Sequence, residues 1–249
     1  MPSHVENKRK KRTRMIIHIP HSSRVIPADL NGLFVIGKDE LELELLRMTD
    51  AYTEELYDYP EAVRVVFPIS RLVVDPERFA DDGEEPMSAM GMGVIYEKTS
   101  SGYPLKRKIT GNERASLLRR FYYPHHRALQ TAVKKELLRN RKVLIVDCHS
   151  FPSEPLPCDL DQMYPRPDFC IGTDAFHTPP ELLDAVLAVI RGEGYSVVVD
   201  RPYSGTIVPM LECRINGAVH SIMLEVRRGL YVDETNGKKT RVFLGLKIL

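Results

Sequence analysis

The sequence predicts a single α/β domain of three layers, built around a mostly parallel mixed central sheet. Short β-branched runs alternate along the chain with amphipathic stretches of helical period, which is the pattern of strand–helix–strand units. No internal repeat or linker divides the 249 residues, and one hydrophobic core can serve a chain of this length. We therefore expect one domain over residues 15–249, preceded by a disordered basic tail over residues 1–14.

The strands are read from compact apolar runs, and the helices from apolar residues that recur every three or four positions. The expected strands are Met15–Ile19, Val63–Phe67, Val143–Asp147, Ser196–Val199 and Val219–Val226. The expected helices are Asp39–Tyr59, Asn112–Arg120 with Asn112 as N-cap, a continuation to Asn140 after an interruption at Pro124, and Glu181–Arg191. A loop covers Ala80–Gly93, and the Pro-rich stretch Phe151–Asp168 is a second loop.

The composition excludes few classes of protein, and it does not favour a protein that binds nucleic acid or a membrane surface. The formal net charge is +1, so the chain as a whole predicts neither a nucleic-acid partner nor a membrane partner. The basic run Lys8–Arg12 is read as a solvated tail, with a nucleic-acid or membrane-surface role as the alternative. No apolar segment of signal-peptide length follows that run, and no two of the four cysteines form a CxxC pair. We therefore expect a cytoplasmic protein with reduced thiols.

Two histidines stand at the carboxyl ends of expected strands, where open α/β sheets place their functional sites. His21 follows Met15–Ile19 and His149 follows Val143–Asp147. Imidazole is a preferred zinc ligand, and catalytic zinc commonly takes three protein ligands and leaves one position for water. Asp50 and Glu54, one turn apart on an expected helix, are the candidates for a carboxylate ligand. Taken alone, a histidine at a strand end is more often a hydrogen-bonded structural residue than a ligand, and Asp50 on an amphipathic helix is usually a solvated charge.

Glu225 is a carboxylate inside an otherwise apolar expected strand, which is costly unless the charge is paired or used. It is either the partner of Arg227 or Arg228 in a salt bridge, or a general base that acts on a water at the metal. Arg71 and Arg78 follow the second expected strand, and their forked donors suit a substrate carboxylate and a developing oxyanion. The alternative for both arginines is an ordinary surface charge.

Two further residues are weaker candidates for contact with a substrate. His126 belongs to a pair with His125 at a helix start, where one ring either lines the site or packs against its neighbours. Tyr203 stands in an expected loop between Pro and Gly. It either closes over a substrate or is a plain turn residue.

Six short motifs occur in one order along the chain: Pro20-His21-Ser22-Ser23, Ser70-Arg71 through Asp75-Pro76-Glu77-Arg78, Tyr123-Pro124-His125-His126-Arg127-Ala128-Leu129, Asp147-Cys148-His149-Ser150, Arg201-Pro202-Tyr203-Ser204-Gly205 and Leu224-Glu225-Val226-Arg227-Arg228-Gly229-Leu230-Tyr231. From about Met15 to Glu234 the chain thereby resembles the N-formylglutamate amidohydrolases, relatives of the zinc carboxypeptidases with a phosphorylase/hydrolase-like fold. The resemblance implies one zinc per chain and a small N-acyl amino acid as partner, with release of a carboxylic acid and the free amino acid.

The resemblance also assigns roles to residues. It implies His21, Asp50 and His149 as the zinc ligands and Glu225 as the base. Arg78 would grip the substrate carboxylate, and Arg71 would assist the carbonyl oxygen.

The chain departs from the family pattern at positions that read the substrate. Ser23 replaces a usual Gly, Thr206 follows Gly205 where a second Gly is usual, and Glu77 replaces the usual Asn before Arg78. Glu77 is expected to pair with Arg78 and so to weaken a carboxylate clamp. A carboxypeptidase-like peptidase, an acylase for another substrate, and a non-catalytic binding protein of the same fold therefore remain alternatives. The sequence does not predict an oligomeric state.

Overall fold

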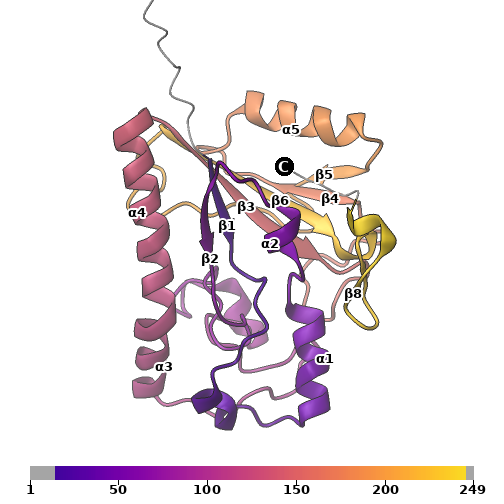
Figure 1. The fold of residues 1–249 in the computed structure, drawn as a ribbon. Coiled ribbons are helices and arrows are strands. Elements are labelled where there is room, and N and C mark those ends of the chain that lie inside the picture. Colours follow the sequence, from indigo (N-terminus) through magenta and orange to yellow (C-terminus); the bar gives the residue numbers. More distant parts are fainter. Residues whose placement is uncertain (1–14, 245–249) are drawn as a thin grey trace, which may run out of the picture.

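The computed structural model describes residues 15–244, so the predicted basic tail over residues 1–14 lies outside the described part. A six-stranded sheet has the order β2-β1-β3-β6-β4-β5. Every neighbouring pair of strands is parallel except β4 and β6, which are antiparallel. The helices lie outside this central sheet (Figure 1). The predicted α/β class, with a mostly parallel mixed sheet, is confirmed.

The strands are β1 (Met15–Ile19), β2 (Val63–Val66), β3 (Val143–Phe151), β4 (Phe169–Gly172), β5 (Val197–Val199) and β6 (Val219–Arg227), with a small hairpin of β7 (Val232–Asp233) and β8 (Lys238–Lys239). The α-helices are α1 (Lys38–Met48), α2 (Thr53–Leu56), α3 (Gly111–Leu117), α4 (Tyr123–Asn140) and α5 (Pro180–Gly192). Short 3-10 helices cover Ala28–Leu33, Pro86–Met90, Arg228–Leu230 and Arg241–Leu244.

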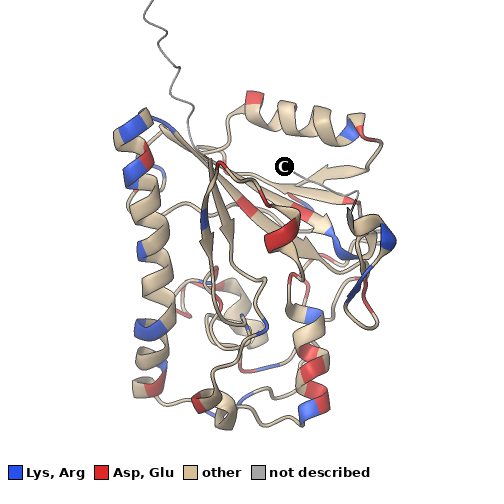
Figure 2. Ribbon diagram, viewed as in Figure 1, with Lys and Arg blue, Asp and Glu red and all other residues tan. Residues whose placement is uncertain are grey.

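One face of the sheet is apolar at one end and polar at the other, and this division positions the site. At the amino ends of the strands, Ile16 and Ile145 pack with Leu129 and Val133 of α4, a helix whose Lys and Arg residues are spread along its length (Figure 2). Side chains alternate between faces along a strand, so the same face continues into polar residues toward the carboxyl ends. Those residues are His18, Asp147, His149 and Glu225.

The opposite face of the sheet carries a continuous apolar cluster across its central strands. Ile17 and Ile19 of β1 join Val146, Cys148, Ile222, Leu224 and Val226 in one buried cluster. Leu56 of α2 and Leu187 of α5 complete that cluster. The chemistry therefore has to lie on the α4 side, beyond the apolar end of that face.

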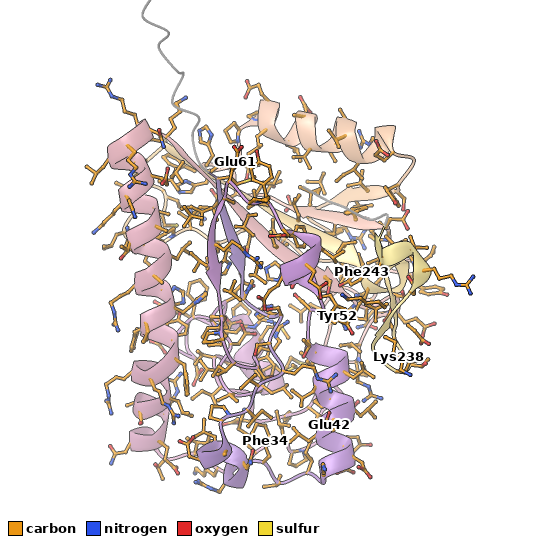
Figure 3. The ribbon with its side chains drawn as sticks, in the orientation of Figure 1. Phe34, Glu42, Tyr52, Glu61, Lys238 and Phe243 are labelled. Atoms are coloured by element: carbon orange, nitrogen blue, oxygen red, sulfur yellow. The ribbon has the colours of Figure 1, made fainter. Side chains whose placement is uncertain are left out.

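The predicted helix Asp39–Tyr59 is wrong, because the chain breaks it into α1 and α2. Thr49–Tyr52 is not helical, and Tyr52 has a left-handed backbone with φ of 63°. The amide of Asp50 donates to the carbonyl of His21 (3.0 Å). The Tyr52 ring packs on Phe243 with centroids 5.7 Å apart. Figure 3 labels both side chains. These distant contacts replace the local helical hydrogen bonds.

The predicted start of the next helix is also wrong. Thr110, not Asn112, caps α3: its hydroxyl accepts from the amide of Glu113, whose carboxylate accepts from the amide of Thr110. Pro124 does not interrupt the chain, because a π-helical turn leads from α3 into α4 and puts Pro124 in the first turn of α4. A proline removes one amide donor from a helix, and here it directly follows a π-helical turn, in which the amide of Tyr123 donates to the carbonyl of Leu118.

Candidate active site

His21, Asp50 and His149 meet at the carboxyl ends of β1 and β3. Asp50 reaches the two rings from the break between α1 and α2, with Oδ2 3.1 Å from Nδ1 of His149 and 3.7 Å from Nδ1 of His21. The two ring centroids are 5.1 Å apart. All three side chains are at most 4% exposed. One ligand atom from each residue lies within 4.8 Å of the others.

Both rings are turned so that Nδ1 faces Asp50. Nε2 of His21 is 2.9 Å from Oδ1 of Asp75, and Nε2 of His149 is 3.1 Å from Oδ1 of Asp147. A carboxylate that accepts from one ring nitrogen leaves the other free to bind a metal. Nδ1 of His21 is buried and has no hydrogen-bond partner. The set of two imidazoles and a carboxylate therefore fits a zinc ion.

The carboxylate of Asp50 is held ionised within this group. Burial alone favours its neutral form, but hydrogen bonds and charge from His149 and His21 outweigh burial and lower its pKa below the ordinary value. Arg228 adds a cation on the other side, 3.4 Å from Oδ1. An ionised, anchored carboxylate is the form that binds a divalent metal.

Glu225 lies on β6 directly opposite His149 in the strand register. Burial, together with the charges of Asp50 and Glu77, raises the pKa of Glu225 to about 8 despite the opposing effect of His149 and Arg71. Its Oε2 atom is buried without a hydrogen-bond partner. The salt-bridge alternative is wrong, because Arg227 pairs with Asp168 (2.6 Å) and Arg228 with Asp50.

The two arginines of the loop after β2 differ in how they are engaged. Arg71 binds Asp75 through Nη2 (2.8 Å) and also donates to the hydroxyl of Tyr96 (2.9 Å). Those partners outweigh burial and raise the pKa of Arg71. Arg78 reaches only 3.8 Å from Asp75, and its buried Nε has no hydrogen-bond partner. Arg78 thus has more unused donor capacity than Arg71.

His126 fastens that loop from α4. Its Nε2 donates to the carbonyl of Pro76 (2.8 Å), and the neighbouring Tyr122 hydroxyl donates to the carbonyl of Arg78 (3.0 Å). Burial lowers the pKa of His126, consistent with a neutral ring. Its side chain therefore reaches the loop that carries Arg78 and holds the loop in place.

Glu77 does not pair with Arg78 as expected. Within the described residues its ion-pair partners are ring nitrogens: Nε2 of His149 (3.1 Å), Nδ1 of His18 (3.6 Å) and Nε2 of His21 (3.8 Å). Together with His18 and Asp147 it makes a second group of possible ligand atoms within 4.8 Å of one another. Glu77 therefore does not neutralise the charge of Arg78, its neighbour in the sequence.

Tyr203 and Glu54 lie apart from the His–Asp–His group. The hydroxyl of Tyr203 accepts from Arg166 (3.0 Å) and donates to Asp159 (3.1 Å), so those two residues engage its polar end. Glu54 is exposed and accepts from the hydroxyl of Ser22 (2.8 Å). Of the two acidic candidates, the structure brings only Asp50 to the histidines.

Three residues of the site were missed by sequence reasoning. Asp147 stands two residues before His149, so strand alternation alone would have placed both on one face. Asp75 stands inside a quoted motif, but only the structure connects it to His21. Arg228 had been considered only as a partner for Glu225.

No helix within residues 15–244 is both long and apolar enough to cross a membrane.

The fold and this group of residues define an α/β protein with a candidate metal site at the carboxyl ends of parallel strands. Residues 13–232 match the family model of N-formylglutamate amidohydrolase. The chain belongs to the N-formylglutamate amidohydrolase family.

Individual relatives agree with that membership. The chain is 29% identical over 236 residues to an N-formylglutamate deformylase of Pseudomonas aeruginosa, covering 91% of this chain and 85% of the relative. The crystal structure of an N-formylglutamate amidohydrolase from Ralstonia eutropha JMP134 superposes with a TM-score of 0.82 at 24% identity, covering 94% of this chain and 89% of that one. A gene product of Agrobacterium tumefaciens matches with a TM-score of 0.63 at 21% identity, covering 88% and 82%. These two structures support the fold.

Proposed function

We propose that this protein is a zinc-dependent amidohydrolase that cleaves the amide bond of an N-formyl amino acid such as N-formylglutamate, releasing formate and the free amino acid. One observation carries the proposal. The unpartnered Nδ1 of His21 faces Asp50 and His149, and the unpartnered carboxylate oxygen of Glu225 stands on the neighbouring strand. The family model and the name of the Pseudomonas relative support the reaction.

His21, Asp50 and His149 would hold one zinc ion per chain. When bound, zinc supplies positive charge that makes a water acidic near neutral pH and polarises the acyl carbonyl. The three buried residues would hold it. Asp75 and Asp147 would keep each ring in the tautomer that leaves Nδ1 free.

Glu225 moves the proton. It accepts a proton from the attacking water as the carbonyl carbon gains an oxygen, and returns it to the amide nitrogen as the C–N bond breaks. With its pKa raised to about 8, Glu225 is a stronger base than an ordinary glutamate once it is ionised, and the positive charge of a bound zinc would favour the ionised form. No second acid is required, since the proton lost by water is the one that the leaving amine gains.

The arginines orient the substrate. Arg78 would bind the substrate's α-carboxylate, because its guanidinium has an unused buried donor and only a distant contact with Asp75. Arg71, fixed by Asp75 and Tyr96, would assist the developing oxyanion. Tyr203 and His126 would act behind these groups, as supports for the surrounding loops rather than as direct contacts.

Metal content and turnover test the proposal together. Purified protein is expected to carry about one zinc per chain, and Glu225→Gln to keep the zinc while losing hydrolysis of N-formyl amino acids. His149→Ala is expected to lose the zinc. Unchanged hydrolysis by Glu225→Gln would remove the base from the proposal, and protein that neither contains zinc nor is stabilised by it would contradict the whole assignment.

A further inference from the structure

His18 is a fully buried histidine that the proposed reaction does not use. It lies on β1 directly opposite Asp147 of β3 in the strand register. Both nitrogens of its ring are engaged: Nδ1 lies 2.7 Å from Oδ1 of Asp147, and Nε2 lies 2.8 Å from Nε2 of His125. His125 stands in the first turn of α4, and its ring packs on Phe67. His18 therefore connects α4 to the carboxylate that lies behind His149.

The hydrogen bonds around Asp147 are consistent with one arrangement of protons. Its Oδ1 lies close to Nδ1 of His18 and also 3.1 Å from Nε2 of His149. An ionised carboxylate only accepts, so each of these two nitrogens carries a proton. The other nitrogen of a neutral ring then holds a lone pair. Nε2 of His18 accepts from Nε2 of His125, and Nδ1 of His149 stays free for a metal.

The outer end of this chain of rings is neutral. Burial, together with the charges of His18 and His126, lowers the pKa of His125 to about 2. A neutral His125 has a single N–H, and its contact with the lone pair of His18 requires that proton at Nε2. The tautomers of His125, His18 and His149 are therefore linked in series through Asp147.

Asp147 depends on His18 for its orientation. The contact with His18 is shorter than those with the ring of His149 (3.1 Å) and the amide of Ile207 (3.0 Å). A buried carboxylate that loses a donor is costly unless it turns toward another partner. The competing acceptor for His149 is Glu77, whose Oε2 also lies 3.1 Å from Nε2 of that ring. The question is which of the two carboxylates holds the ring.

We propose that His18, held in turn by His125, is a positioning residue for the metal site: it anchors Asp147 so that His149 keeps Nδ1 turned toward the metal position. This inference rests on the proposed zinc-dependent function. His18 and His125 act through Asp147 and His149 and do not touch the reacting atoms. A buried chain in which every donor has an acceptor holds its members in one arrangement.

The zinc affinity of His18 variants tests this role. His18→Leu removes the donor to Asp147 and is expected to raise the Kd for zinc by about tenfold to a hundredfold, as for other residues that orient metal ligands. His18→Asn places an amide nitrogen near the position of Nδ1, so it is expected to keep most of the wild-type affinity. Chelator competition measures the Kd, and the absorption spectrum of cobalt(II)-loaded protein reports whether the ligand geometry is kept.

His177 is the matched control, because it is as fully buried as His18 and lies outside the site. Its Nδ1 donates to the carbonyl of Val219 (2.7 Å), and its Nε2 accepts from the amide of Arg214 (2.8 Å). His177→Leu is expected to lower the free energy of unfolding in urea while the Kd for zinc stays at the wild-type value. An equal loss of zinc affinity in His177→Leu and His18→Leu would overturn the proposal, because general destabilisation would then explain both.

A second pair of variants covers the case in which His18→Leu does not fold. His125→Leu removes the donor to Nε2 of His18, and it is expected to raise the Kd for zinc by a smaller factor, since His125 stands one residue further from the metal position. His125→Gln offers an amide nitrogen near the position of Nε2 and is expected to restore the affinity. Wild-type zinc affinity in every folded leucine variant of His18 and His125 would overturn the proposal and leave Glu77 as the residue that holds His149.

Comparing zinc binding with turnover separates this inference from the proposed function. Zinc binding that weakens in His18→Leu, in a protein that does not hydrolyse N-formyl amino acids, would end the proposed reaction and leave the positioning role standing. Normal hydrolysis by wild-type protein, with equal zinc affinity in His18→Leu, would leave the reaction standing and end the positioning role.

Discussion

Nη2 of Arg228 lies 3.4 Å from Oδ1 of Asp50, a contact between residues 178 positions apart. The other oxygen of Asp50 faces His149, so the two oxygens divide between the arginine and the candidate metal position. Arg228 also donates to the carbonyl of Arg47 (2.7 Å) and to the carbonyl of Ser150 (3.3 Å). It thereby ties the end of α1 and the break that carries Asp50 to the end of β3.

Replacing Arg228 is expected to weaken zinc binding, in addition to any loss of folding stability. Arg228→Met should raise the Kd for zinc by about tenfold to a hundredfold, the usual range for residues that orient metal ligands, and Arg228→Lys should restore part of it. Competition with a chelator measures the Kd. The control is Arg227→Met, which removes the neighbouring pair with Asp168. Equal zinc affinity in Arg228→Met and wild type would show that Asp50 is held without Arg228.

Arg71 and Arg78 are expected to fail in different ways when replaced. Arg71→Met leaves Asp75 as a buried carboxylate without its closest cation, which should destabilise the protein by about 3–5 kcal/mol. Arg78→Met removes a weakly paired guanidinium, so it should raise KM for an N-formyl amino acid with a much smaller loss of stability.

Urea unfolding and steady-state kinetics on the two variants separate these outcomes. A large stability loss in Arg78→Met with an unchanged KM would mean that Arg78 is a structural residue. The Asp75 pairing would then be stronger than its 3.8 Å separation suggests.

The polar group at the sheet edge was largely predictable, because it follows from local rules. Strand ends after apolar runs located His21 and His149, and the apolar run around Glu225 indicated a buried carboxylate. The break that delivers Asp50 was not predictable from periodicity. It depends on contacts with residues far along the chain, such as Tyr52 with Phe243 and with the carbonyl of Gly237.

The same reasoning explains the other misses. Strand β4 was not predicted, because it is short. It is recognisable as a strand only through its antiparallel pairing with β6 in the folded sheet. The partner of Glu77 was misjudged because adjacency in sequence suggested Arg78, whereas the loop turns Glu77 toward the histidines. Local sequence patterns predict helices and strands, but they do not show which of several nearby groups a charged side chain will pair with.

Thr110 and Asn112 offer a direct comparison between a real and a mistaken N-cap. Thr110→Ala removes the hydroxyl that accepts from the amide of Glu113 and should cost about 1 kcal/mol of stability. Asn112→Ala lies within the first turn of α3 and should be neutral or slightly stabilising, since alanine is the better helix former. Urea unfolding of the two variants measures the difference. Equal losses would contradict the capping assignment.

Lys106 is a buried lysine whose charge should make stability depend on pH. Its Nζ donates to the carbonyl of Tyr96 (2.7 Å) and lies 5.4 Å from the ring centroid of Phe34. Burial lowers the pKa of Lys106 to about 7 from 10.5, against a weak opposing effect of Glu97. Between these two pH values the unfolded chain binds a proton that the folded chain does not, so this group makes stability rise with pH, while below about pH 7 its destabilising effect is complete.

Lys106→Met is expected to remove this dependence. Its advantage in free energy of unfolding over wild type should be largest near pH 7 and should shrink toward pH 10, by at most about 1.4 kcal/mol per pH unit. Urea unfolding at several pH values measures it, with Lys134→Met on the exposed side of α4 as the control. The lost hydrogen bond to Tyr96 shifts the whole curve without changing its slope. Parallel curves for Lys106→Met and wild type would mean that Lys106 keeps its ordinary pKa in the folded protein.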